Sequence, residues 1–185
     1  MEIAQKGRIL LGLLLVSLLI NIFQARYIHS VLEPSRPFHI GEKAQNPEVI
    51  DILGNKTELS FTDTSVPTVL YIFRPDCVWC QRNTQTLDML ASGVGTKYRV
   101  IGLSLNNRGL ENFLRNRRVE FPVYVIAPFA RATAYLSVST PTTILISPTG
   151  VIRNVWSGAY VSETRDSLEA FFGIPLHDAA QQRMN

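Results

Sequence analysis

The chain of 185 residues is long enough for one domain with extensions but short for two full domains. Hydrophobic residues make up 46% and charged residues 18% of the chain, which excludes a globally disordered protein. The net charge of +3 gives the main domain no strongly basic face, so we expect no nucleic-acid partner. The only two cysteines, Cys77 and Cys80, are too few for a disulfide-stapled mini-protein but enough for one redox pair.

An uncharged apolar segment lies near the N-terminus. Residues 9–25 carry no charge and follow Lys6 and Arg8, and 17 residues are near the lower limit for a membrane-spanning helix. The length also fits a secretory signal, but Phe23 departs from the small-residue pattern of a cleavage site. We therefore predict a cytoplasmic stub and retained transmembrane signal-anchor in residues 1–26, with a cleaved signal or a buried core helix as alternatives.

The charges that flank this segment predict its orientation. Basic residues before a span favour the cytoplasmic side, so the rest of the chain is expected on the periplasmic or extracytoplasmic side. The expected location is the inner (cytoplasmic) membrane, crossed once, with the lipid bilayer contacted through residues 9–25. Disulfides persist in the compartment outside that membrane.

Three segments are predicted after the anchor. Residues 27–48 contain three prolines and are read as an irregular linker that leads into the domain. Residues 49–173 are the predicted domain, and residues 174–185 read as a polar tail. The domain starts with a predicted hairpin over residues 49–62 that turns at Gly54.

The rest of the domain alternates predicted strands and helices. Apolar runs rich in β-branched residues indicate strands at 66–74, 98–105, 122–126, 142–147 and 151–158. Helices are predicted at 78–92 (ending at Gly93), at 109–118, at 129–136, and from a capping Ser162 with Leu168, Phe171 and Phe172 facing inward. Alternating strands and helices followed by an antiparallel hairpin predict an α/β fold with a mixed central sheet flanked by helices.

The position of the two cysteines indicates redox chemistry. Cys77 falls between a predicted buried strand and the start of a helix, where the helix dipole and free backbone N–H groups stabilise a thiolate. Cys80, one helical turn later, is placed to resolve a mixed disulfide by attacking the sulfur of Cys77. Arg74 and Arg82 favour the thiolate and Asp76 opposes it.

Other uses of the cysteine pair have less support from the sequence. A zinc site needs about four ligands, and the histidines, His29, His39 and His177, all lie in the linker or the tail. A purely structural disulfide would restrict the unfolded chain little, because the loop it closes is so short. The sequence thus implies no metal and no tightly bound cofactor.

A second motif, Thr140-Pro141, comes directly before a predicted strand and a predicted hairpin. Three segments accompany this motif: CVWC, which starts at Cys77, the loop PTTILISPTG, and the closing VIRNVWSG, which ends at Gly158. In these segments the chain resembles the thioredoxin superfamily. The resemblance is to the membrane-anchored TlpA/ResA-like branch of thiol–disulfide oxidoreductases (redoxins). It covers roughly residues 37–173.

This resemblance implies a thioredoxin-like fold and an enzyme that exchanges disulfides with partner proteins through Cys77 and Cys80. It implies that Pro141 is cis and that the Thr140 backbone pairs with the substrate, while Trp79 either contacts the substrate or packs over the pair. The implied partners are extracytoplasmic protein thiols or disulfides and a membrane redox partner. Maturation of cytochrome c or of another metalloenzyme is the implied setting.

Three positions depart from the pattern of this branch. Asp76 stands where a tryptophan is usual, Asn83 where many members have a glutamate, and Tyr71 where thioredoxins often bury an aspartate. The direction of electron flow therefore stays open. Two alternative functions also stay open. The first is a copper-binding module similar to Sco proteins, which use a histidine from a later loop, but this sequence has no histidine between His39 and His177. The second is a thiol peroxidase, which would need Thr or Ser at the position of Arg74.

Overall fold

The computed structural model describes the backbone of residues 2–32, 38–115, 121–128 and 133–176, and all side chains in these ranges except those of residues 2–7, 9–10, 27–32 and 133. The chain forms two compact units, Met1–Arg36 and Pro37–Asn185.

The first unit is one long helix. Helix α1 spans Glu2–Leu32 and includes residues 27–32, which were predicted to be irregular. It continues because the first proline after the apolar segment is Pro34. Its described apolar side chains from Leu11 to Phe23 are exposed. Over the residues described, no helix combines the length and the apolar character that a membrane span requires.

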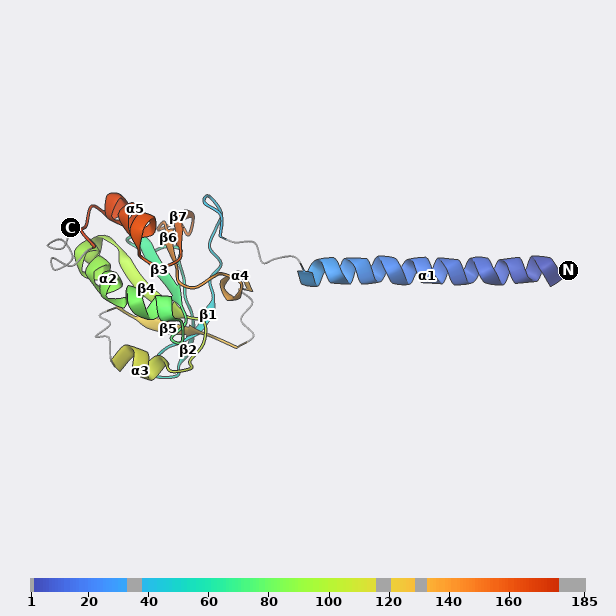
Figure 1. Ribbon diagram of the computed structural model, residues 1–185, viewed down its shortest axis with the longest axis horizontal. Coiled ribbons are helices and arrows are strands. Elements are labelled where there is room, and N and C mark those ends of the chain that lie inside the picture. Colours follow the sequence, from blue (N-terminus) through green and yellow to red (C-terminus); the bar gives the residue numbers. More distant parts are fainter. Residues whose placement is uncertain (1, 33–37, 116–120, 129–132, 177–185) are drawn as a thin grey trace. The chain divides into compact units, whose positions relative to one another are not determined.

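The second unit is built on a mixed sheet of seven strands (Figure 1). The strands are β1 (Glu48–Ile50), β2 (Lys56–Glu58), β3 (Thr68–Phe73), β4 (Arg99–Ser104), β5 (Val123–Ile126), β6 (Thr142–Ile146) and β7 (Ile152–Ser157). Their order across the sheet is β2-β1-β5-β4-β3-β6-β7. Strands β3, β4 and β5 run parallel, and β6, β7, β1 and β2 are added antiparallel. The predicted mixed sheet is thus confirmed.

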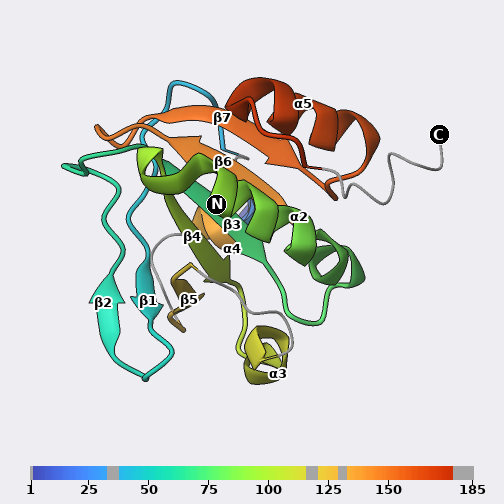
Figure 2. The same cartoon turned by 90° about the vertical axis from the view of Figure 1, so that its left-hand side faces the viewer.

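Helices pack on both faces of the sheet. They are α2 (Val78–Val94), followed by a 3-10 turn at Gly95–Lys97, and α3 (Leu110–Arg115), α4 (Thr133–Leu136) and α5 (Ser162–Phe172). Figure 2 shows α2 and α5 side by side on one face. There β3 contributes Tyr71 and Phe73 to a core that includes Leu168 of α5. The alternate residues Leu70 and Ile72 point into a second core, which Tyr135 of α4 helps to cover. Because β3 is covered on both sides, it reads as an unbroken apolar run.

The predicted N-terminal hairpin is confirmed. Strands β1 and β2 pair antiparallel, and Val49 lies opposite Thr57. The Asp51 carboxylate closes the turn by accepting the backbone N–H groups of Leu53 and Asn55, both at 2.8 Å. Gly54 adopts a φ of 89°, which a residue with a side chain rarely takes.

Part of the predicted linker belongs to the folded unit. The N–H groups of Gly41 and Ala44 donate to the carbonyls of Ile152 and Gly150, each at 2.8 Å. The Phe38 ring lies 4.9 Å from the ring of Tyr135. These contacts were not foreseen, because they join segments more than 90 residues apart and leave no local periodicity.

Helix α2 ends later than predicted. Gly95, with a φ of 53°, is its C-terminal cap, while Gly93 lies inside the helix. A Cβ at Gly93 would lie 2.6 Å from Cγ2 of Ile174. This glycine is therefore required by close packing and not by helix termination, so the predicted end at Gly93 was wrong.

Two predictions at the C-terminal end are also corrected. Ser162 does not cap α5: the cap residue is Val161, no side chain caps the helix, and Ser162 is the first helical residue with a φ of 43°. The predicted polar tail starts too early, because Leu176 is only 2% exposed. Of the inward-facing residues, Leu168 is buried, whereas Phe171 is 46% exposed and rests on the Trp156 ring.

Some predicted positions lie outside the described residues. They are the end of the helix predicted at 109–118, the start of the helix predicted at 129–136, and the tail from residue 177 onward.

Candidate active site

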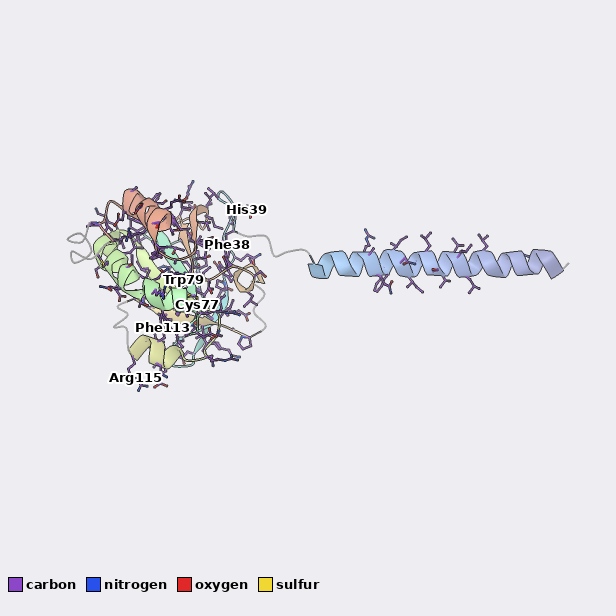
Figure 3. All side chains as sticks on the ribbon, in the orientation of Figure 1. Phe38, His39, Cys77, Trp79, Phe113 and Arg115 are labelled. Carbon is purple, nitrogen blue, oxygen red and sulfur yellow. The ribbon has the colours of Figure 1, made fainter. Side chains whose placement is uncertain are left out.

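The two cysteines lie where strand β3 passes into helix α2. Pro75 follows the strand, and the N–H of Cys77 donates to the carbonyl of Arg74 at 3.1 Å, which closes a tight turn. Cys77 is the N-terminal cap of α2, with extended backbone angles (φ −84°, ψ 119°). The turn therefore fixes the first cysteine at the end of the helix that carries free N–H groups. Figure 3 shows Cys77 and Trp79 together at this end of α2.

Cys77 is partly exposed and surrounded by hydrogen bonds. Its sulfur accepts the backbone N–H of Cys80 at 3.3 Å and lies 3.7 Å from the carbonyl oxygen of Thr140, to which the thiol donates. Partial burial raises the pKa of Cys77. The side chain and backbone of Cys80, the side chain of Thr140 and the backbone of Trp79 outweigh this effect, so the pKa falls below the ordinary value of 9.0. Cys77 is thus suited to be the attacking thiolate.

Cys80 has the opposite environment. It is completely buried, and both cysteines are free thiols. Burial raises the pKa of Cys80 to about 12, and the neighbouring Cys77 contributes in the same direction. The pair therefore contains one reactive and one shielded thiol, as the sequence predicted from their positions in the helix.

The Thr140-Pro141 loop faces the cysteines. The peptide bond between these residues is cis, which confirms the prediction for Pro141. The Thr140 carbonyl is turned toward Cys77, as its contact with the sulfur shows. Gly158 N–H donates to the Pro141 carbonyl at 2.8 Å, and Gly158 has a φ of 98°, so the end of β7 holds this loop in place.

The residues that flank the cysteines form an exposed rim. Trp79 is 48% exposed and Val78 is 58% exposed, so both present apolar surface to solvent beside Cys77. The Arg82 guanidinium lies 4.8 Å from the centre of the Trp79 ring, a cation–π arrangement. The lowered pKa of Cys77 comes from hydrogen bonds and not from Arg74 or Arg82.

A group of buried polar side chains lies behind Cys80, and we call it the buried polar cluster. Its members, each no more than 4% exposed, are Tyr71, Asn83, Thr143 and Tyr160. The Tyr71 hydroxyl donates to the Cys80 carbonyl at 3.5 Å, and the Tyr160 N–H donates to Asn83 Oδ1 at 2.8 Å. The hydroxyls of Thr143 and Tyr160 are hydrogen-bonded to each other.

Sequence reasoning noticed Tyr71 and Asn83 but missed Thr143 and Tyr160. Sheet register brings Thr143 opposite Tyr71, because β6 pairs antiparallel with β3. The sequence signal for Thr143 was a hydroxyl side chain within an apolar strand that is buried on both faces. Tyr160 lies in the loop after β7, where no periodic pattern indicates that its side chain is buried. Among the described residues, no three His, Cys, Asp or Glu side chains are grouped so that they could hold a metal ion.

Comparison with known proteins gives structural neighbours only. No protein-family model and no curated protein sequence matches the chain. A thiol:disulfide interchange protein from Bacteroides sp. matches with a TM-score of 0.58 and 18% identity, over 74% of this chain and 91% of that one. Peroxidoxin BcpB from Mycobacterium tuberculosis matches with a TM-score of 0.59 and 19% identity, over 74% and 97%.

A secreted disulfide oxidoreductase from Mycobacterium tuberculosis also matches, with a TM-score of 0.55 and 15% identity, over 68% of this chain and 93% of that one. At such identities the likeness establishes the fold. The chain therefore has a thioredoxin-like α/β fold, as the sequence resemblance implied.

Proposed function

We propose that this protein is a thiol–disulfide oxidoreductase that exchanges disulfides with partner proteins through Cys77 and Cys80. The observation that carries the proposal is the unequal pair at the start of α2. The Cys77 sulfur is accessible and accepts the N–H of Cys80 at 3.3 Å, while Cys80 is fully buried. Two structural neighbours, a thiol:disulfide interchange protein and a secreted disulfide oxidoreductase, support the same function.

The proposed reaction has two steps. The Cys77 thiolate attacks one sulfur of a partner disulfide, forms a mixed disulfide and releases the other partner sulfur as a thiolate. Cys80 then loses its proton and attacks the Cys77 sulfur, which breaks the mixed disulfide and releases the second partner thiol. The partner gains two electrons and two protons, and the Cys77–Cys80 disulfide forms. The reverse sequence oxidises a partner dithiol.

The geometry gives each group near the pair a role in these steps. The α2 N-terminus holds the Cys77 thiolate, and the Thr140 carbonyl, 3.7 Å from that sulfur, marks the side from which a partner chain approaches. Trp79 and Val78 provide exposed apolar surface beside the attacking sulfur. Trp79, Thr140 and Pro141 are therefore the proposed substrate-binding residues.

Insulin reduction by dithiothreitol tests the proposal, with the full chain kept in mild detergent. The wild-type protein should accelerate precipitation of the insulin B chain, and Cys77→Ser should abolish the acceleration. Cys80→Ser should accumulate a mixed disulfide with an insulin chain, visible by mass spectrometry without reductant. Acceleration that persists in Cys77→Ser would overturn the proposal.

We further propose that the protein is tethered to the cytoplasmic membrane with its domain on the extracytoplasmic side. The support is the uncharged segment 9–25 behind Lys6 and Arg8, together with the exposed apolar side chains of α1. Carbonate extraction should leave the wild-type chain in the membrane fraction. A double change, Leu14→Arg with Leu18→Arg, should release it. Recovery of the wild type in the soluble fraction would contradict the tether.

The proposed partners follow from that location. They are extracytoplasmic protein thiols or disulfides and a membrane redox partner that resets the pair, in cytochrome c or other metalloenzyme maturation. Co-purification of Cys80→Ser from cells should yield covalent adducts that dithiothreitol releases. Adducts formed only with cytoplasmic proteins would contradict this part of the proposal.

A peroxidase remains the second candidate, because peroxidoxin BcpB shares the fold. The position three residues before Cys77 holds the exposed Arg74 in place of a hydroxyl residue. Hydrogen peroxide consumption by the Cys80→Ser variant, at a rate comparable to that of the wild type, would favour the peroxidase over disulfide exchange.

A further inference from the structure

We propose that Tyr71, held in place through Asn83, is a positioning residue for the resolving step, in which its hydroxyl hydrogen-bonds the Cys80 sulfur as the thiolate forms. This inference rests on the proposed disulfide exchange and concerns its second step. It gives a role to a buried polar cluster that the first step does not use.

The need for such a group follows from the burial of Cys80. The side chain is completely buried, yet it has to become a thiolate before it can attack Cys77. A buried charge without hydrogen bonds is strongly disfavoured. Among the described residues, the titratable groups that interact with Cys80 are Cys77, Tyr71 and Tyr160, none of which is a carboxylate. Stabilisation of the thiolate therefore comes from neutral groups. The backbone of Arg74 and the side chain of Thr140 already lower the pKa of Cys80, but burial outweighs them.

Tyr71 is a further donor placed for this role. Its hydroxyl contacts the Cys80 carbonyl at 3.5 Å, which is long for a hydrogen bond between two oxygens. That carbonyl lies inside α2, where carbonyls accept the N–H of the residue four positions later, so it does not depend on Tyr71. Its contact with the Cys80 carbonyl keeps the phenol next to Cys80, and the phenol also interacts electrostatically with both thiols. A hydroxyl so weakly engaged can turn toward a new thiolate.

Asn83 is the second polar side chain that acts on the phenol. Its Oδ1 accepts the N–H of Tyr160 at 2.8 Å, and since an N–H can only donate, this contact fixes which end of the amide carries the oxygen. The Nδ2 group is buried and has no hydrogen-bond partner in the described parts of the chain. Asn83 and Cys80 lie three positions apart on α2, so they share one face of the helix.

The phenol and the amide influence each other directly. Burial raises the pKa of Tyr71 well above its ordinary value, Tyr160 and Cys80 add to this effect, and the Asn83 amide opposes it. Since Oδ1 is engaged by the Tyr160 N–H, Nδ2 is the end of the amide that acts on the phenol, although the two groups are not hydrogen-bonded to each other. An N–H directed at the phenol oxygen leaves the phenol proton available for Cys80. In the resolving step this proton stays on Tyr71, while the Cys80 proton leaves with the released partner thiol.

Reaction of the reduced full chain with 5,5′-dithiobis(2-nitrobenzoate) separates the two steps. The first thionitrobenzoate release reports attack by Cys77 and depends on reagent concentration. The second release reports resolution by Cys80 and does not. Tyr71→Phe removes only the hydroxyl and should slow the second release about tenfold, the size expected for one lost hydrogen bond to an ionised group. The first release should keep its dependence on reagent concentration.

Tyr135→Phe is the matched control. Tyr135 is also a fully buried tyrosine, and its hydroxyl donates to the Gln45 carbonyl at 2.6 Å, on the opposite face of the sheet. This variant loses a buried hydroxyl but should keep both release rates. Between pH 6 and 8 the second release should rise with pH in both the wild type and Tyr71→Phe, with the variant slower at every pH.

The outcomes separate the two proposals. A second release in Tyr71→Phe as fast as in the wild type overturns the role of Tyr71 and leaves disulfide exchange standing. Equal slowing in Tyr71→Phe and Tyr135→Phe also overturns it, because the effect would then be a general loss of stability. The absence of any second release from the wild type, or a first release that persists in Cys77→Ser, would instead contradict the proposed function.

Discussion

The difference in pKa between the two thiols predicts a large difference in their alkylation rates. Burial raises the pKa of Cys80 to about 12, so about one molecule in 100,000 carries its thiolate at pH 7. The pKa of Cys77 lies below 9.0, so its thiolate fraction at pH 7 exceeds about one in 100. Since only the thiolate is alkylated, Cys77 should react at least about 1,000-fold faster.

Iodoacetamide labelling of the reduced full chain, quenched at intervals and read by peptide mass spectrometry, measures both rates. The labelling rate of Cys77 should rise with pH and reach half of its maximum below pH 9, while that of Cys80 should still be far from its maximum there. The ratio is a lower limit, because the complete burial of Cys80 also blocks the reagent. The same chain in guanidinium chloride is the control, in which the two rates should become similar. Comparable rates in the folded chain, or faster labelling of Cys80, would refute the assignment of Cys77 as the attacking thiol.

Three further predictions concern stability, measured by urea denaturation. Gly93→Ala should lower the free energy of unfolding by about 1–3 kcal/mol, because its Cβ would meet Ile174 at 2.6 Å. In an Ile174→Ala background the same change should raise the free energy of unfolding by about 1 kcal/mol. Equal effects of Gly93→Ala in the two backgrounds would contradict the contact. Between pH 9 and pH 10 the free energy of unfolding of the reduced wild type should fall by about 1 kcal/mol more than that of Cys80→Ala. The reason is that the Cys80 thiol ionises near pH 9.0 in the unfolded chain but stays protonated up to about pH 12 in the folded chain. Parallel pH dependences of the two proteins would contradict the raised pKa. Thr143→Val should lower the free energy of unfolding by about 1–3 kcal/mol, because it leaves the Tyr160 hydroxyl unpaired. Adding Tyr160→Phe should recover part of this loss. A further loss of equal size would argue against the hydrogen bond between the two hydroxyls.

Local sequence patterns predicted the elements that build the site. The apolar run 66–74, the break at Pro75 and the two cysteines on the following helix indicated a thiol pair at a helix N-terminus. The pattern succeeds because burial on both faces of β3 demands apolar residues at consecutive positions. The unequal environments of Cys77 and Cys80 also follow from local geometry, since one caps the helix and the other lies one turn inside it.

Predictions failed where distant packing changes the meaning of a local signal. Gly93 looked like a helix end, but it makes room for Ile174, and Gly95 ends the helix. Ser162 looked like a cap, but the chain enters α5 from Val161 without a side-chain cap. For Gly93 the contact that requires the residue lies elsewhere in the fold, whereas Ser162 begins the helix without capping it.

The sequence by itself determined the cysteine pair, the parallel strands that present it and the break before Cys77, because neighbouring residues are enough to specify a strand, a turn and a helix start. Only the tertiary structure decided that the Thr140 carbonyl lies against Cys77 and that Thr143 and Tyr160 join Tyr71 and Asn83 behind Cys80. These residues come from separate strands and loops, and the register of β3 against β6 brings them together. The reactivity of a buried thiol depends on the groups around it in space, and a linear pattern does not encode that arrangement.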